Sequence, residues 1–199
     1  MAKPSRNIAK HLTLVFLGTF VLAGIIDFGS ELFVRQVSSL VLALLFLLFI
    51  ILIHISFDII AVAAMTASEV PFHSKAANRI HGSTHAVKLI RNADLVANLC
   101  ADVIGDVTGT ISGALTAGIA LDILKTAPGW SSYEVLIGTV FLALVASLTV
   151  AGKAVGKMFA VKRAHEVIFV VGKIVAWVEG TTGLTIINTG KNRKRGKKT

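Results

Sequence analysis

The sequence predicts an all-α integral membrane protein with three core transmembrane helices, an extra N-terminal span and juxtamembrane amphipathic helices. Hydrophobic residues make up 54% of the chain and the mean hydropathy is +0.78, well above the values of a soluble domain. The apolar residues form blocks of the ~20 residues that a helix needs to cross a ~30 Å hydrocarbon layer. The prolines Pro4, Pro71 and Pro128 lie outside the middle of these blocks, so continuous helices can satisfy their own backbone groups in lipid.

Four apolar blocks follow one another along the chain. The first, 12–26, is short enough to be a signal peptide, but no clear small-residue cleavage site precedes Asp27, so we expect an uncleaved span. The second runs from 37 to about 65. The third covers 95–121, and the fourth runs from 135 to about 155. These blocks define the predicted spans.

Two segments between and after the spans are expected to lie at the membrane surface. The polar stretch 68–94 is interrupted by Gly82, which predicts two short helices. Residues 157–178 have an apolar face with charges at helical spacing and Trp177 near the end. This pattern predicts an amphipathic helix that lies in the interface and does not cross it.

The chain therefore divides into three predicted regions. Residues 1–36 hold a basic segment, the first span and an outer link. Residues 37–178 form the transmembrane domain. Residues 179–199 form a basic tail that is expected to be disordered, because its end lacks apolar residues.

The basic residues predict the orientation in the membrane. The net charge of +9 is concentrated in the segment after the second span and in the tail, beside membrane spans, so it reports topology and no nucleic-acid partner is expected. The positive-inside rule predicts a multi-pass cell-membrane protein with both termini in the cytoplasm, or with the N-terminus outside if the first block is cleaved. The tail could bind anionic lipid or only fix topology. Cys100 is the single cysteine, so an intrachain disulfide is excluded.

Four charged residues fall inside the predicted spans: Asp58, Asp102, Asp106 and Lys153. Each charge at a helix centre costs roughly 2.5–3.5 kcal/mol on insertion scales, so such groups face a partner, a cavity or an ion. Asp102 and Asp106 are four residues apart and share a helix face, and the simplest arrangement places Lys153 beside both. This group could be an ion pair that joins helices. It could also be a cation pathway, because two carboxylates and one ammonium leave one negative charge.

Other polar residues near the spans have local explanations. Thr66 and Ser68 could bond to their own helix or cap one, and Glu69 could cap the next helix. His54 and Asp58 are four residues apart on the second span and could form an interhelical hydrogen bond or a proton relay. No nucleophile and base are paired at a meaningful spacing, so no enzymatic activity is expected.

Three stretches resemble the membrane domain of the CNNM/CorB-type magnesium and cobalt transporters. Residues 66–69, Thr-Ala-Ser-Glu, are similar to that family's S-x-S-E signature. Residues 99–107, Leu-Cys-Ala-Asp-Val-Ile-Gly-Asp-Val, resemble its L-I-G-N-x-L-V-N-I segment. Residues 152–157, Gly-Lys-Ala-Val-Gly-Lys, resemble its G-E-x-x-P-K segment. Residues 79–94 are similar to its cytoplasmic helix pair, so the resemblance covers roughly 37–178.

The resemblance implies a homodimeric bundle of three core spans in the lipid bilayer, with a belt of juxtamembrane helices. It also implies a membrane cavity that holds a largely dehydrated Mg²⁺. Carried over to this chain, the expected metal ligands and the residue at the family's glutamate position are Thr66, Ser68, Asp102, Asp106, Gly152 and Lys153.

The departures from the family pattern set the functional alternatives. The glutamate position is Lys153, both asparagine positions are aspartates, and paired CBS domains are not expected after residue 178. The first expectation is divalent-cation (Mg²⁺/Co²⁺) transport or homeostasis in the cell membrane, with a degenerate ion site. The alternative is a non-transporting membrane scaffold or accessory subunit in which Lys153 occupies the place of the ion. A protonated lysine cannot ligate a metal, so transport would require Lys153 to turn away or lose its proton.

Overall fold

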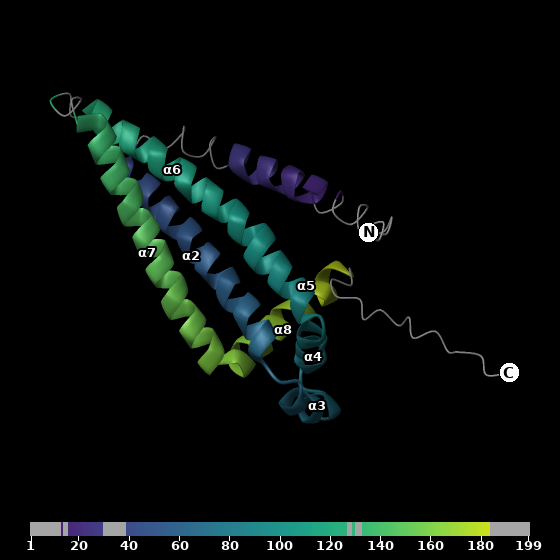
Figure 1. Cartoon of the computed structure of the whole chain (residues 1–199). Coiled ribbons are helices and arrows are strands. Elements are labelled where there is room, and N and C mark those ends of the chain that lie inside the picture. The colour runs from purple at the N-terminus through teal and green to yellow at the C-terminus, as the bar shows by residue number, and fades with distance from the viewer. Residues whose placement is uncertain (1–12, 14–15, 30–38, 127–128, 130–132, 184–199) are drawn as a thin grey trace, which may run out of the picture. The chain divides into compact units, whose positions relative to one another are not determined.

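The computed structural model describes residues 13, 16–29, 39–126, 129 and 133–183, and these residues form an all-helical protein (Figure 1). Three helical segments are long and apolar enough to cross a membrane: Leu40–Thr66, Ala93–Lys125 and Glu134–Lys162. An apolar helix, Phe16–Gly29, precedes them and is shorter than the ~20 residues of a full span. The predicted fold class and the multi-pass membrane assignment are confirmed at this level.

The chain forms two compact units. Unit 1 comprises residues 1–58 and 98–156, and unit 2 comprises residues 59–97 and 157–199. Each unit is described by itself below. The basic N-terminal segment up to residue 12, most of the two outer links and the tail from 184 onward lie outside the described residues.

Unit 1 is built on α2 (Leu40–Thr66), α6 (Gly105–Thr126) and α7 (Glu134–Lys162), which run alongside one another in Figure 1. A short π-helix, η1 (Asn98–Ile104), leads directly into α6. The core consists of aliphatic residues from all three helices: Ala43, Leu47, Ile50, Ile51, Val107, Ile111, Leu115, Ile119 and Val145. On α6 these residues recur every four positions, which places them on one face of the helix.

Many of the described residues on the outer surface of unit 1 are apolar, as expected for a bundle surrounded by lipid. On α7, for example, Val135 is 83% exposed and Val150 is 66% exposed. In water such a surface would be strongly unfavourable. The polar side chains on the buried side of α6 are satisfied within the helix, since the hydroxyls of Thr108, Ser112 and Thr116 donate to carbonyls three or four residues earlier.

Unit 2 contains α3 (Val70–Ala77), α4 (Ser83–Arg91), α5 (Ala93–Ala97) and α8 (Ala164–Thr182). The predicted break at Gly82 is confirmed: its φ of +85°, a left-handed value that suits glycine, precedes the first turn of α4. Helices α4 and α8 approach until their backbones touch. A Cβ atom added at Gly172 would lie 2.6 Å from the carbonyl oxygen of Gly82 and 2.9 Å from the backbone nitrogen of Ala86.

Two predicted boundaries differ from the structure. Helix α7 continues to Lys162, beyond the predicted end near 155, and α8 begins at Ala164 instead of 157. Residues 157–162 contain no proline or glycine, so α7 extends until the backbone leaves helical geometry at Arg163 (φ −119°, ψ 26°). The third span begins with α5 and η1, so it is not α-helical throughout.

Candidate functional site

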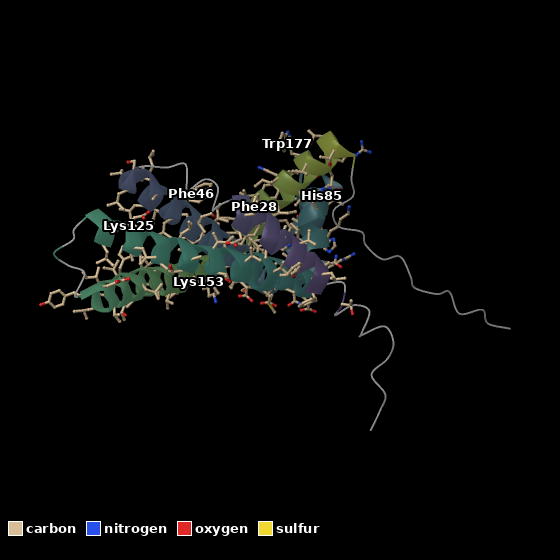
Figure 2. The ribbon with its side chains drawn as sticks, turned by 90° about the horizontal axis from the view of Figure 1, so that it is seen from above. Phe28, Phe46, His85, Lys125, Lys153 and Trp177 are labelled. Carbon is tan, nitrogen blue, oxygen red and sulfur yellow. The ribbon has the colours of Figure 1, made fainter. Side chains whose placement is uncertain are left out.

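The most buried ionic group of unit 1 is an ion pair between α2 and α7. The Nζ atom of Lys153 lies 3.5 Å from Oδ2 of Asp58. The Asp58 side chain is 6% exposed, whereas the Lys153 side chain is 29% exposed. Figure 2 labels Lys153 on α7 among the helices of the bundle. A carboxylate at this depth in a membrane span requires a compensating charge, and the ammonium supplies it.

Small residues on α7 allow this pair to form. A Cβ atom added at Gly152 would lie 2.5 Å from Cδ1 of Ile55 on α2. The missing side chain therefore lets α7 approach α2 closely at the position before Lys153. The buried residues of α7 in unit 1 include Val145 and Gly156, which lie before and after Lys153 along the helix.

His54, one turn before Asp58, faces α6. The residue is 6% exposed. A Cβ atom added at Gly109 would lie 3.1 Å from His54 Cε1, and one added at Gly105 would lie 3.8 Å from Nε2. The glycine face of α6 therefore accommodates the imidazole ring. One helix, α2, thus contacts α6 through His54 and pairs with α7 through Asp58.

This arrangement corrects the expected partners of Lys153. The sequence analysis placed the ammonium beside Asp102 and Asp106, but among the described residues the carboxylate within 4 Å of it belongs to Asp58. Asp102 lies in η1, Asp106 lies in the first turn of α6, and both are exposed. Asp106 is exposed between the buried residues Gly105 and Val107, so its side chain points away from the buried face of α6.

The π-helical segment also changes the relation between Asp102 and Asp106. A π-helix makes i→i+5 hydrogen bonds, so its turns are wider than those of an α-helix. The prediction that residues four apart share a face assumes α-helical geometry across both positions. That assumption fails at η1, which ends at Ile104, between the two aspartates.

The expected metal ligands belong to different units. Asp102, Asp106 and Gly152 belong to unit 1, whereas Thr66 and Ser68 belong to unit 2. The Thr66 hydroxyl donates to the carbonyl oxygen of Val62 at 2.7 Å, which is the helix back-bond considered above. Among the residues that the structure describes, no group of three His, Cys, Asp or Glu side chains is arranged to hold a metal ion.

Ser68 and Glu69 connect elements of unit 2. The backbone N–H of Ser68 donates to Nε2 of His165 at 3.2 Å. Glu69 occupies the N-cap position of α3, but its side chain does not cap that helix. It accepts a hydrogen bond from Nε of Arg91 at 2.7 Å instead, and this contact lowers the pKa of the Glu69 carboxyl below its ordinary value. The expected capping role of Glu69 is therefore wrong, and Arg91 is the partner that the sequence analysis missed.

Asp106 lines a groove of ≈ 460 Å³ between α6 and the helix Phe16–Gly29. The same groove contains Asp27, together with the hydroxyl-bearing residues Thr19 and Thr110. The remaining lining is mainly small and apolar. This groove brings oxygen-bearing side chains from two helices of unit 1 to one surface.

The partner of Lys153 was present in the sequence but could not be selected from it. Asp58 and Lys153 each lie about two helical turns before the end of their helix, so their depth in the membrane is compatible with pairing. Asp102 has a similar depth in its own span. Only the rotation of each helix about its axis distinguishes Asp58 from Asp102.

No protein-family model matches the chain, and no significant similarity to a curated protein or to a solved structure is found. The likeness to the CNNM/CorB-type transporters therefore stays a prediction that depends on the three sequence stretches.

Proposed function

We propose that this protein is a membrane-embedded relative of the CNNM/CorB-type transporters that acts in divalent-cation homeostasis without conducting the ion. In this proposal the ammonium of Lys153 replaces the cation in the membrane interior and neutralises Asp58. The chain would then serve as a scaffold or accessory subunit, as a homodimer in the cell membrane with the basic segments on the cytoplasmic side.

The Lys153–Asp58 ion pair is the observation that supports this proposal. One ammonium and one carboxylate sum to zero charge, so the pair itself creates no electrostatic demand for a metal ion. Bringing Mg²⁺ to Asp58 would require Lys153 to move away and remain charged in an apolar environment, which is costly. The close packing at Gly152 favours the position of the lysine seen in the structure.

Calorimetric titration of the purified protein with Mg²⁺ and Co²⁺ tests the proposal. We expect no heat of binding from the wild type. Lys153→Glu places a second carboxylate beside Asp58, and we expect this variant to bind the divalent ion through oxygen ligands. The matched control is the double variant Asp58→Lys with Lys153→Asp. This variant keeps the ion pair, so we expect it to give no heat of binding with either ion.

Two results would contradict the proposal. Binding of Mg²⁺ by the wild type would show that the lysine does not replace the ion. The absence of a heat of binding in a folded Lys153→Glu variant would show that position 153 is not beside a cation site.

Transport of the ion is a second candidate function, and the groove at Asp106 favours it. Two carboxylates and two hydroxyl-bearing residues line this groove, and oxygen ligands of this kind suit Mg²⁺. Uptake of Mg²⁺ by proteoliposomes that contain a magnesium-sensitive dye distinguishes the candidates. Uptake that Asp106→Asn abolishes would support transport, whereas the first proposal expects no uptake above that of protein-free vesicles.

A further inference from the structure

Helix α8 has two apolar faces, and the described part of the chain buries one of them. Ala164, Ile168, Gly172 and Ala176 recur every four residues and are buried. Gly172 on this face contacts the backbone of Gly82 and Ala86. Val170, Ile174 and Trp177 lie on the opposite side of the helix and are 54%, 55% and 66% exposed. A helix that is apolar on both sides is expected to have a second apolar environment beyond its protein partner.

Two ammonium groups lie beside this uncovered face. Nζ of Lys173 is 4.4 Å from the centroid of the Phe169 ring, and Nζ of Lys75 on α3 is 4.5 Å from the same centroid. Each lysine gains a cation–π contact from this position. Lys173 is also four residues before Trp177, so the two side chains are neighbours on the helix surface. The ring therefore holds two positive charges near the exposed apolar stripe.

The charge around these lysines is not locally neutralised. Helices α3 and α4 contain Lys75 and Lys88 and no acidic side chain, and the carboxylate of Glu69, just before α3, pairs with Arg91. Of the acidic residues on α8, Glu166 lies 2.7 Å from Arg163 and Glu179 lies 2.7 Å from His85. Among the described ion pairs of unit 2, neither Lys75 nor Lys173 has a carboxylate partner. The matching ligand must carry negative charge beside an apolar body.

Chain continuity identifies a membrane as the source of that ligand. The candidate span α7 ends at Lys162, and α8 begins after the single residue Arg163. A helix joined so closely to a span starts at the boundary between hydrocarbon and water. Tryptophan prefers this boundary, and lysine and arginine there attract anionic headgroups.

We infer that α8 and α3 bind anionic phospholipid, with the phosphate of the headgroup between or beside Lys75 and Lys173 and the acyl chains against Val170, Ile174 and Trp177. The binding is specific to this surface and does not depend on the basic tail. The lipid binding is also independent of the proposed function, because the residues of α3 and α8 that would bind the lipid belong to unit 2, whereas the Lys153–Asp58 pair belongs to unit 1.

Fluorescence of Trp177 provides a direct test, because the chain contains only two tryptophans. In the full-length Trp130→Phe protein, Trp177 is the sole tryptophan. The protein is reconstituted into phosphatidylcholine vesicles with an equal fraction of phosphatidylglycerol, and either one lipid or the other is brominated. We expect brominated phosphatidylglycerol to quench Trp177 more strongly than brominated phosphatidylcholine at the same fraction.

Substitutions then assign the lipid preference to particular residues. Each of Lys75→Gln and Lys173→Gln should lower the apparent preference for phosphatidylglycerol about fivefold, the factor that corresponds to ~1 kcal/mol per lysine. The tail variant Lys191→Gln with Lys194→Gln is the control and should leave the preference unchanged. Far-UV circular dichroism verifies that each variant keeps its helices.

Three results would overturn the inference. Equal quenching by the two lipids would show that the surface does not select anionic headgroups. If the tail variant loses the preference for phosphatidylglycerol and the two lysine variants keep it, the tail and not this surface binds the anionic lipid. No quenching by either lipid would show that Trp177 is not in the membrane, and in that case the exposed stripe contacts protein instead.

Discussion

The internal packing of unit 1 differs from the internal packing of unit 2. Unit 1 packs large aliphatic residues between α2, α6 and α7 and encloses one ion pair, whose atoms are 3.5 Å apart. Unit 2 packs glycine and alanine between α4 and α8, and one of its polar contacts, Arg91–Glu69 at 2.7 Å, lies at the surface. The shorter of these two contacts is thus the more exposed one. Distance alone therefore does not rank these interactions, because the environment determines what a broken contact costs.

The largest effect is expected from the ion pair of unit 1. Lys153→Met removes the ammonium next to Asp58, and removal of one partner of a buried pair typically costs ~3–5 kcal/mol. The lysine is part-exposed, so we expect the lower end, about 3 kcal/mol, in the free energy of unfolding measured by titration with sodium dodecyl sulfate in mixed micelles.

A double variant provides the control for this prediction. Asp58→Leu combined with Lys153→Met replaces both charges by apolar groups and should recover most of the lost stability. A loss below ~1 kcal/mol in the single variant would contradict the prediction. It would show that the pair is solvated in the membrane-embedded protein, and the contrast between the two units would disappear.

A smaller effect is expected from the glycine contact of unit 2. Gly172→Ala adds a methyl group 2.6 Å from the Gly82 carbonyl oxygen, and backbone atoms cannot turn aside as a side chain can. Overpacking of this kind typically costs ~1–3 kcal/mol. Faster amide hydrogen exchange in α4 and α8, with little change in the described part of unit 1, is the expected result.

The matched substitution in the same helix is Gly180→Ala. An added Cβ atom at Gly180 meets nothing within 4 Å, and alanine has a higher helix propensity than glycine by ~1 kcal/mol. We expect slower exchange in this variant. If the two alanine variants behave alike, helix propensity and not the backbone contact governs the stability of α8.

The smallest effect is expected at Glu69, because this side chain is in contact with solvent. The hydrogen bond from Arg91 lowers the pKa of the Glu69 carboxyl. The pair therefore contributes its stabilisation above the ordinary carboxyl pKa and loses it as the pH falls through the lowered value. Carbon-13 NMR titration should report a Glu69 pKa below the usual range, and Arg91→Gln should raise it toward the ordinary value.

Salt provides the control for that titration. Exposed charges are screened at high ionic strength, so the depression of the pKa should shrink between low and high salt. A Glu69 pKa that is the same in wild type and in Arg91→Gln would show that the 2.7 Å contact is not maintained in solution.

Local features of the sequence were enough to predict the three long apolar helices and the break between the two short helices. Long apolar blocks identified α2 and α7 because membrane insertion depends on summed hydropathy over about twenty residues. Gly82 marked the boundary between two short helices because its left-handed φ is a property of the residue itself. These predictions required no knowledge of which helices touch.

The contacts between helices were not predictable in the same way. The choice of Asp58 over Asp102 depends on how α2 and α6 are rotated about their axes, and that rotation results from the packing of His54 against Gly109 and of Ile55 against Gly152. The side chain of Glu69 was assigned to a local cap because Arg91, its actual partner, is distant in sequence. Such partners become visible only when the chain is folded.

The π-helical turn at Asn98–Ile104 has a consequence for how this protein could be altered. A turn with i→i+5 hydrogen bonds contains one residue more than an α-helical turn with i→i+4 hydrogen bonds. The segment can therefore accommodate the insertion of a single residue. Deleting one residue there would convert the segment to a regular α-helix, and it would change the angle between Asp102 and Asp106 about the helix axis without changing either residue. The spacing of two acidic groups along this span is therefore set by helical pitch as much as by composition.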